Sequence, residues 1–168
     1  NKIKLNFNHP VKELVWVVHD SGTQFEANNN WFNYTHEQAT TVDNSNATTY
    51  SHVSGLLGPS STAKNGVTQG KLILNGNDRF YSRDGRYFNL VQPYQHHENV
   101  PNNAGINVYS FALKPEEHQP SGSLNMSRID TAVLDLQYVG TTTNKQVSIF
   151  AVNYNVLRIL SGMGGIAY

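Results

Sequence analysis

Residues 11–19 have the sequence VKELVWVVH, and this stretch decides the fold. Leu14 and Trp16 alternate with Val15 and Val17, which is the period-two pattern of a β-strand. Both faces of this strand are therefore apolar, and strands of this kind are found where both faces are covered. We expect Trp16 to lie in the core of a β-sandwich and a further neighbour to cover the outer face of the strand.

Several other segments show strand periodicity or a strand-like apolar composition. They are residues 2–7, 31–34, 50–57, 71–75, 86–94, 106–113, 129–138 and 147–160. Asn75-Gly76 and Asp84-Gly85 are typical of tight turns between strands. Pro115 favours one short helical turn.

The pattern as a whole is that of an all-β chain. About eight strands, without a long helix or an internal repeat, favour an antiparallel two-sheet jelly-roll sandwich with long loops. We expect residues 1–168 to form it as a single domain. Residues 20–70 are mostly rich in Asn, Ser, Thr and Gly, which predicts surface or contact loops. An immunoglobulin-like sandwich is the alternative, although such domains are usually near ~100 residues with shorter connections.

Composition narrows the function. The 12 Lys and Arg balance the 12 Asp and Glu, so no basic stripe is expected and direct nucleic-acid binding is disfavoured. The absence of Cys removes disulfides, thiolate metal sites and Cys nucleophiles. No apolar run approaches ~18 residues, so we expect no membrane insertion. The chain starts at Asn1 and enters a strand pattern at once, so we expect it to be part of a longer protein.

The clusters that could carry chemistry are weak. His96-His97-Glu98 is the densest set of metal-ligand types, but neighbours in an extended segment point to opposite faces. The glycines from Gly162 to Gly165 resemble a phosphate loop, which would need a helix after it, so a turn is favoured. No nucleophile has a base at motif spacing. We therefore expect no metal site, no cofactor, no catalytic residue and no enzymatic activity.

Charged and glycosylation motifs have plain interpretations too. Three arginines lie close to Asp78 and Asp84, which favours a solvated, salt-bridged turn over a phosphate site; they are Arg79, Arg83 and Arg86. The candidate N-glycosylation sites are the N-x-S/T sequons at Asn33, Asn46 and Asn125. Sequons also arise by chance in an Asn-rich chain, and the sequence favours chance.

Three blocks of sequence resemble the major capsid proteins of nucleocytoplasmic large DNA viruses. They are FNHPVKELVWVV at 7–18, GINVYSFALKPEEHQPSGSLNMSRID at 105–130 and VNYNVLRILSGMGGIAY at 152–168. The blocks are long and occur in the order of the family, so the resemblance spans essentially the whole chain. It is weakest in the loops of residues 20–70.

The resemblance implies a structural role in the outer shell of a virion. A family subunit is a double jelly roll, and this chain is similar to its second half. Three subunits form a pseudo-hexagonal capsomer, and capsomers tile an icosahedral shell around an internal membrane and double-stranded DNA. The implied partners are the homotrimer, neighbouring capsomers and minor capsid proteins. Outer loops in this family often carry glycans, sometimes outside standard sequons.

Two rival functions belong to other classes. A lectin-like sandwich would stack sugars on loop aromatics such as Trp31, Tyr34 and Tyr50. A cupin-like enzyme would need a His/Glu metal set inside a barrel, whereas the seven histidines are scattered through loops and strand ends. The sequence favours the capsid interpretation over both.

Overall fold

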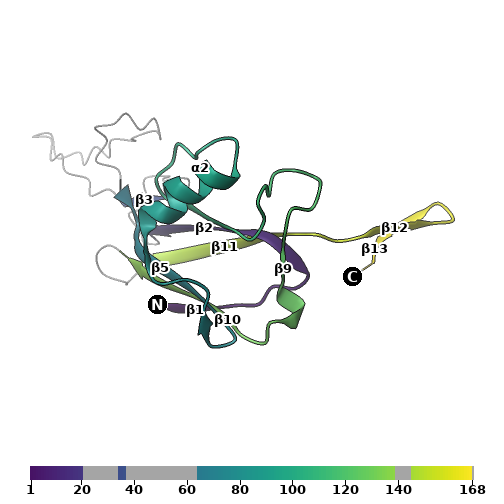
Figure 1. Ribbon diagram of the computed structural model, residues 1–168, viewed down its shortest axis with the longest axis horizontal. Helices are drawn as coiled ribbons and strands as arrows, with labels where there is room; N and C mark the ends of the chain where they lie inside the picture. The colour runs from purple at the N-terminus through teal and green to yellow at the C-terminus, as the bar shows by residue number, and fades with distance from the viewer. Residues whose placement is uncertain (21–33, 37–63, 139–144, 168) are drawn as a thin grey trace, which may run out of the picture.

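The computed structural model describes residues 1–20, 34–36, 64–138 and 145–167 (Figure 1). Several predictions lie outside these described residues. They are the strand at 50–57, nearly all of the strand at 31–34, the aromatics Trp31 and Tyr50, and the sequons at Asn33 and Asn46.

One antiparallel sheet contains five strands. Its order is β1-β10-β5-β6, and β7 also pairs with β5. The bounds are β1 (Lys2–Leu5), β10 (Ala132–Tyr138), β5 (Val67–Leu74), β6 (Asn77–Asp78) and β7 (Arg83–Asp84). The turn predicted at Asn75-Gly76 is confirmed, because it connects β5 to β6 with positive φ at both residues.

The second antiparallel sheet contains four strands. Its order is β11-β2-β8, with β9 also paired to β2. The bounds are β11 (Lys145–Asn153), β2 (Pro10–Asp20), β8 (Ile106–Ser110) and β9 (Leu124–Asn125). Two short pairs lie outside the sheets, β3 (Thr35–His36) with β4 (Lys64–Asn65) and β12 (Leu157–Leu160) with β13 (Met163–Ile166).

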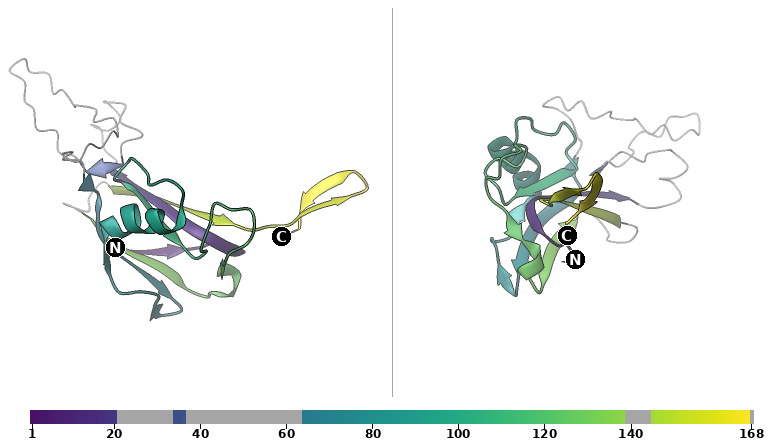
Figure 2. Two further views of the ribbon diagram at one scale, coloured as in Figure 1. Left: turned by 45° about the horizontal axis from the view of Figure 1, so that its top comes forward. Right: turned by 90° about the vertical axis from the view of Figure 1, so that its right-hand side faces the viewer.

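Three short helices complete the described structure. They are a π-helix η1 (Tyr87–Val91), an α-helix α2 (Gln92–His96) and a 3₁₀-helix η2 (Met126–Arg128). Figure 2 shows the two sheets stacked with the α2 segment beside them and the β12–β13 hairpin projecting from one end. No helix in the described part of the chain is long and apolar enough to cross a membrane.

The core lies between the two sheets. Leu14 and Trp16 of β2 are fully buried, as are Leu134 and Leu136 of β10. The ring of Phe88 packs edge-to-face on Trp16 with centroids 5.1 Å apart. The predicted all-β, antiparallel two-sheet sandwich is therefore confirmed, and so is the burial of Trp16.

The outer face of β2 is covered in part by this chain itself. Val17 of β2 and Val108 of β8 are buried on that face. His97, which follows α2, reaches Glu13 on the same face. The neighbour expected from outside the sandwich is thus partly an intramolecular segment, which corrects the prediction. Phe150 on the adjacent strand β11 lies opposite Val15 and remains 58% exposed.

The strand predicted at 86–94 is wrong. Those residues form η1 and α2, because their buried positions recur at helical rather than alternating spacing. Phe88 and Asn89 are buried on one turn, and Gln92 and Pro93 on the next. Pro93 fits the first turn of a helix, where a backbone N–H has no intrahelical partner.

Two further predicted elements end early. The strand at 147–160 stops at Asn153 and is followed by the separate β12–β13 hairpin, so one long strand was wrong. The strand at 106–113 stops at Ser110, and Leu113 is exposed. The residues around Pro115 form turns and bends.

Candidate functional site

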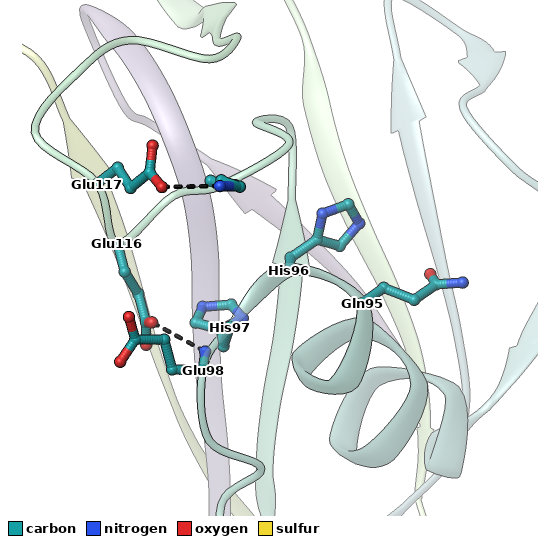
Figure 3. Close-up of a pocket in the computed structure, with 7 residues that line it drawn as sticks. Gln95, His96, His97, Glu98, Glu116 and Glu117 are labelled. Atoms are coloured by element: carbon teal, nitrogen blue, oxygen red, sulfur yellow. Dashed lines mark hydrogen bonds and ion pairs between the residues drawn. The ribbon is translucent and has the colours of Figure 1, made fainter.

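The described structure has a polar cleft beside the end of α2. It has a volume of about 190 Å³ and is lined by Gln95, His96, His97, Glu98, Lys114, Glu116 and Glu117 (Figure 3). Two segments meet here, the end of α2 and the loop after β8. This cleft contains His96-His97-Glu98, which is the densest cluster of metal-ligating residue types in the sequence.

The two histidines of the cluster make separate contacts. His97 Nε2 lies 2.7 Å from Glu13 Oε2, and both side chains are only 12% exposed. His96 Nδ1 lies 2.9 Å from the backbone oxygen of Leu113. Nowhere in residues 1–20, 34–36, 64–138 and 145–167 do three or more His, Asp or Glu side chains gather as a metal would require.

The other polar contacts of the cleft are internal ties. Glu116 Oε2 accepts a hydrogen bond from the backbone N–H of Glu98 at 3.0 Å, and Lys114 Nζ lies 2.9 Å from Glu117 Oε1 (Figure 3). Ser121 Oγ accepts from the Lys114 N–H at 2.9 Å, which closes the loop. These contacts hold the loop after β8 against the α2 segment, and the contact of His97 with Glu13 holds that segment against β2.

A second polar region covers the free edge of β8. Asn89 Nδ2 donates to the Ile106 backbone oxygen at 2.9 Å, and Gln92 Oε1 accepts from the Ser110 N–H at 3.0 Å. Both amides are buried. Because an unpaired edge strand is open to pairing with another chain, these side chains close an edge that would otherwise invite association.

The arginine-rich turn is tied internally, as predicted. Arg86 donates to Asp84 Oδ1 from both its backbone N–H, at 2.9 Å, and its Nε, at 3.1 Å. The side-chain hydrogen bond from Arg86 is the main cause that lowers the pKa of the Asp84 carboxyl. Arg83 lies over the Tyr87 ring, 5.5 Å from its centroid.

Of the three sequons, the one at Asn125 lies in the described residues. Asn125 is exposed, and its side chain accepts a hydrogen bond from the Ser127 N–H at 3.1 Å, which caps η2. Ser127 Oγ in turn accepts from the His9 N–H at 2.9 Å. In the folded chain the Asn125 sequon therefore has a structural role.

Exposed apolar side chains gather on two surfaces. One is the outer face of β11, with Phe150 at 58% and Val152 at 40% exposure. The other is the β12–β13 hairpin, which sequence reasoning placed within a single long strand. The Ser161-Gly162 pair, with positive φ at both residues, is the two-residue turn that could have revealed it.

The aromatics proposed for sugar stacking are represented by one described residue. Tyr34 is half-buried, and its ring is tilted against His19 with centroids 6.3 Å apart. The backbone oxygen of Tyr34 is packed so closely on Gly105 that a Cβ there would collide with it. Tyr34 is thus part of the packing of the sandwich.

Comparison with known proteins matches residues 1–165 to a family model described as the large eukaryotic DNA virus major capsid protein. The major capsid protein of Pyramimonas orientalis virus is 47% identical over 100% of this chain and 39% of its own length. That of Paramecium bursaria Chlorella virus 1 is 40% identical over 99% of this chain and 42% of its own length.

Solved structures of viral capsid proteins also resemble this chain. A chain of the PBCV-1 virus capsid matches with a TM-score of 0.71 and 35% identity, over 100% of this chain and 45% of that chain. The Faustovirus major capsid protein shares the fold, with a TM-score of 0.63 at 12% identity. These likenesses confirm the jelly-roll sandwich. The chain spans less than half the length of the relatives named here.

Proposed function

Because this chain belongs to the family of large eukaryotic DNA virus major capsid proteins, we propose that it is the second jelly roll of a double jelly-roll subunit. Three such subunits form a pseudo-hexagonal capsomer, and capsomers tile an icosahedral outer shell. The chain works by packing with copies of itself, with neighbouring capsomers and with minor capsid proteins. It neither binds nucleic acid directly nor inserts into a membrane.

One observation carries the proposal. The likeness to a PBCV-1 capsid chain extends over 100% of this chain but only 45% of that chain, at 35% identity. A region of this size has room for one jelly-roll sandwich, and the remainder of the relative is long enough for a second domain of similar size.

The exposed surface supports association. Phe150 and Val152 present apolar side chains on the outer face of the β11-β2-β8 sheet, beside a region that the chain already covers. Exposed apolar groups of this kind mark protein–protein contacts. The formal net charge of zero leaves little long-range repulsion between copies. Permanent interfaces commonly bury ~2,000–5,000 Å².

The test is light scattering on the complete capsid polypeptide that contains this chain, with circular dichroism as the control for folding. We expect a mass three times that of the subunit. Phe150→Asp should shift this mass toward the monomer, because a carboxylate would lose its hydration in an apolar interface. Leu113→Asp, at a residue 71% exposed outside the β11 face, is the matched control and should leave the mass unchanged.

A folded, stable and strictly monomeric parent at tens of micromolar would overturn the capsid proposal. A glycan array on the same preparation then separates the alternatives. Saturable sugar binding by a monomer would favour the lectin-like function, whereas a trimer without sugar binding supports the capsid function.

A further inference from the structure

The last described residues form an arm whose root is fixed to the sandwich. We define the C-terminal arm as residues 154–167. At its root, the Tyr154 N–H donates to the Pro10 backbone oxygen at 2.8 Å, and Lys12 Nζ lies 5.1 Å from the centroid of the Tyr154 ring. Asn153 Nδ2 donates to the Asn8 backbone oxygen at 3.3 Å. The arm therefore leaves the sandwich in a defined direction.

Beyond the root, the arm is a regular hairpin. Four residue pairs connect β12 and β13, from Leu157 opposite Ile166 to Leu160 opposite Met163. The Ala167 N–H also donates to the Val156 backbone oxygen at 2.8 Å. The hairpin projects away from both sheets, at the yellow end of the chain (Figures 1 and 2).

Both faces of this hairpin are apolar. From the strand pairing, Leu157, Ile159 and Ile166 share one face, and Leu160 and Met163 share the other. All five are between 60% and 74% exposed. Arg158 is the single charged residue from 157 to 166.

Two glycines leave room for a neighbour close to the backbone of the hairpin. Gly164 lies opposite Ile159 and Gly165 opposite Arg158, and a Cβ added at either glycine would meet open space. Glycine inside a strand is often found where another backbone approaches closely. A two-stranded hairpin is also marginally stable alone in water. The arm thus has the chemistry of an element that is completed by an apolar protein surface.

We propose that the C-terminal arm docks on the jelly roll that precedes this chain in the same capsid polypeptide, an inference that rests on the proposed double jelly-roll subunit. More than half of the PBCV-1 capsid chain lies outside the region matched here, so the same polypeptide holds a partner of sufficient size. Covalent linkage gives that partner a high effective concentration.

The apolar faces also favour a partner within the subunit. If the arm were covered only in the assembled shell, each unassembled subunit would expose open strand edges and apolar faces. Such edges promote open-ended association. Docking within the subunit removes them before assembly, and the near absence of charge on the arm excludes a polyanionic partner such as nucleic acid.

The test is photo-crosslinking of the complete capsid polypeptide with benzoylphenylalanine in place of Ile159. We expect crosslinks within one polypeptide, to peptides that precede Asn1. The same probe at Leu113, which is exposed on the body, is the control and should not give these crosslinks. Crosslinks that join two polypeptides, or none to the preceding region, would overturn the inference.

A second measurement keeps the result independent of assembly. In the parent, amide exchange at 157–166 should be slowed by about 100-fold or more relative to the free-peptide rate. Ile159→Asp should return it to within about tenfold of that rate, while Leu113→Asp leaves the protection intact. Free-peptide rates in the folded parent would also overturn docking. Light scattering on the same samples measures trimer formation separately. A trimer whose arm is unprotected would reject docking but not the capsomer. A monomer whose arm is protected would reject the proposed capsomer but not docking.

Discussion

Trp16 lies in the hydrophobic core of the sandwich. It is fully buried between the sheets, with Phe88 edge-on at 5.1 Å. Replacing a buried Trp by Ala removes these contacts and leaves a cavity, which costs ~3–5 kcal/mol. The free energy of unfolding of a typical domain is only ~5–15 kcal/mol. We expect Trp16→Ala to be mostly insoluble and to lower the denaturant midpoint sharply where soluble protein is recovered.

The control for Trp16→Ala is an exposed apolar residue on the described surface. Leu113, 71% exposed, serves this purpose. Leu113→Ala should change the free energy of unfolding by about 0.5 kcal/mol or less. Similar midpoints for the two variants would contradict the position of Trp16 in the core.

Two tyrosines make stability sensitive to alkaline pH. Burial raises the pKa of Tyr109, and burial also raises that of Tyr138. The unfolded chain releases these protons near pH 10, before the folded chain does. Stability is therefore complete below about pH 10 and falls as pH rises toward the folded pKa values.

Tyr109→Phe removes one of these ionisations, so its stability should fall less steeply above about pH 10 than that of the parent. Urea unfolding at a series of pH values measures this slope. Tyr81→Phe, at a ring 83% exposed, is the matched control and should follow the parent curve. Identical alkaline slopes for the parent and Tyr109→Phe would contradict the prediction.

At the scale of elements, side chains of η1 and α2 form hydrogen bonds with backbone groups at the free edge of β8, as a neighbouring strand would. Gln92 accepts the Ser110 N–H and donates from its own Nε2 to the Tyr87 hydroxyl at 2.9 Å. Gln92→Leu would leave the Ser110 N–H buried without this partner, which costs about 1–3 kcal/mol. We expect the midpoint of unfolding to move to a lower urea concentration and amide exchange at Ser110 to become faster.

Gln95 provides the comparison, since it is on the same helix but exposed. Gln95→Leu should leave both the midpoint and the exchange at Ser110 unchanged. Equal loss of stability in the two variants would indicate that Leu disturbs the helix itself rather than the β8 edge.

At the scale of the whole molecule, the loops between β2 and β5 are proposed to contribute to subunit contacts. Shortening the loop from Asn44 to Asn65 should therefore weaken trimers. The described structure limits where this deletion can end, because Asn65 Nδ2 donates to the Gly85 backbone oxygen at 3.2 Å and to Asn107 Oδ1. A deletion should therefore stay within residues 44–63 and keep β4.

With Asn65 retained, this deletion in the complete polypeptide should weaken trimers by at least about tenfold in dissociation constant, or ~1.4 kcal/mol. The sandwich should stay folded by circular dichroism. Light scattering across a dilution series measures the change. A deletion that leaves trimers as strong as before would show that these loops do not contribute to the interface.

Much of this architecture could be predicted from the sequence, because alternation along a strand is a local property. The positions of β2 and β10, the burial of Trp16 and Leu134, and the turn at Asn75-Gly76 depend on residues a few positions apart. The strand geometry assumed from the sequence for His96 and His97 does not apply, because His96 ends α2 and His97 follows it in an extended conformation.

What only the tertiary structure decided are the features that depend on distant partners. The segment 86–94 has apolar residues compatible with a strand, and it is helical because Phe88 packs on Trp16 while Asn89 and Gln92 satisfy the edge of β8. The hairpin at the C-terminal arm separates from β11 where Tyr154 binds Pro10. The physical reason is that periodicity encodes which side of a segment is apolar, whereas the partner that covers that side is chosen by contacts with residues outside the segment.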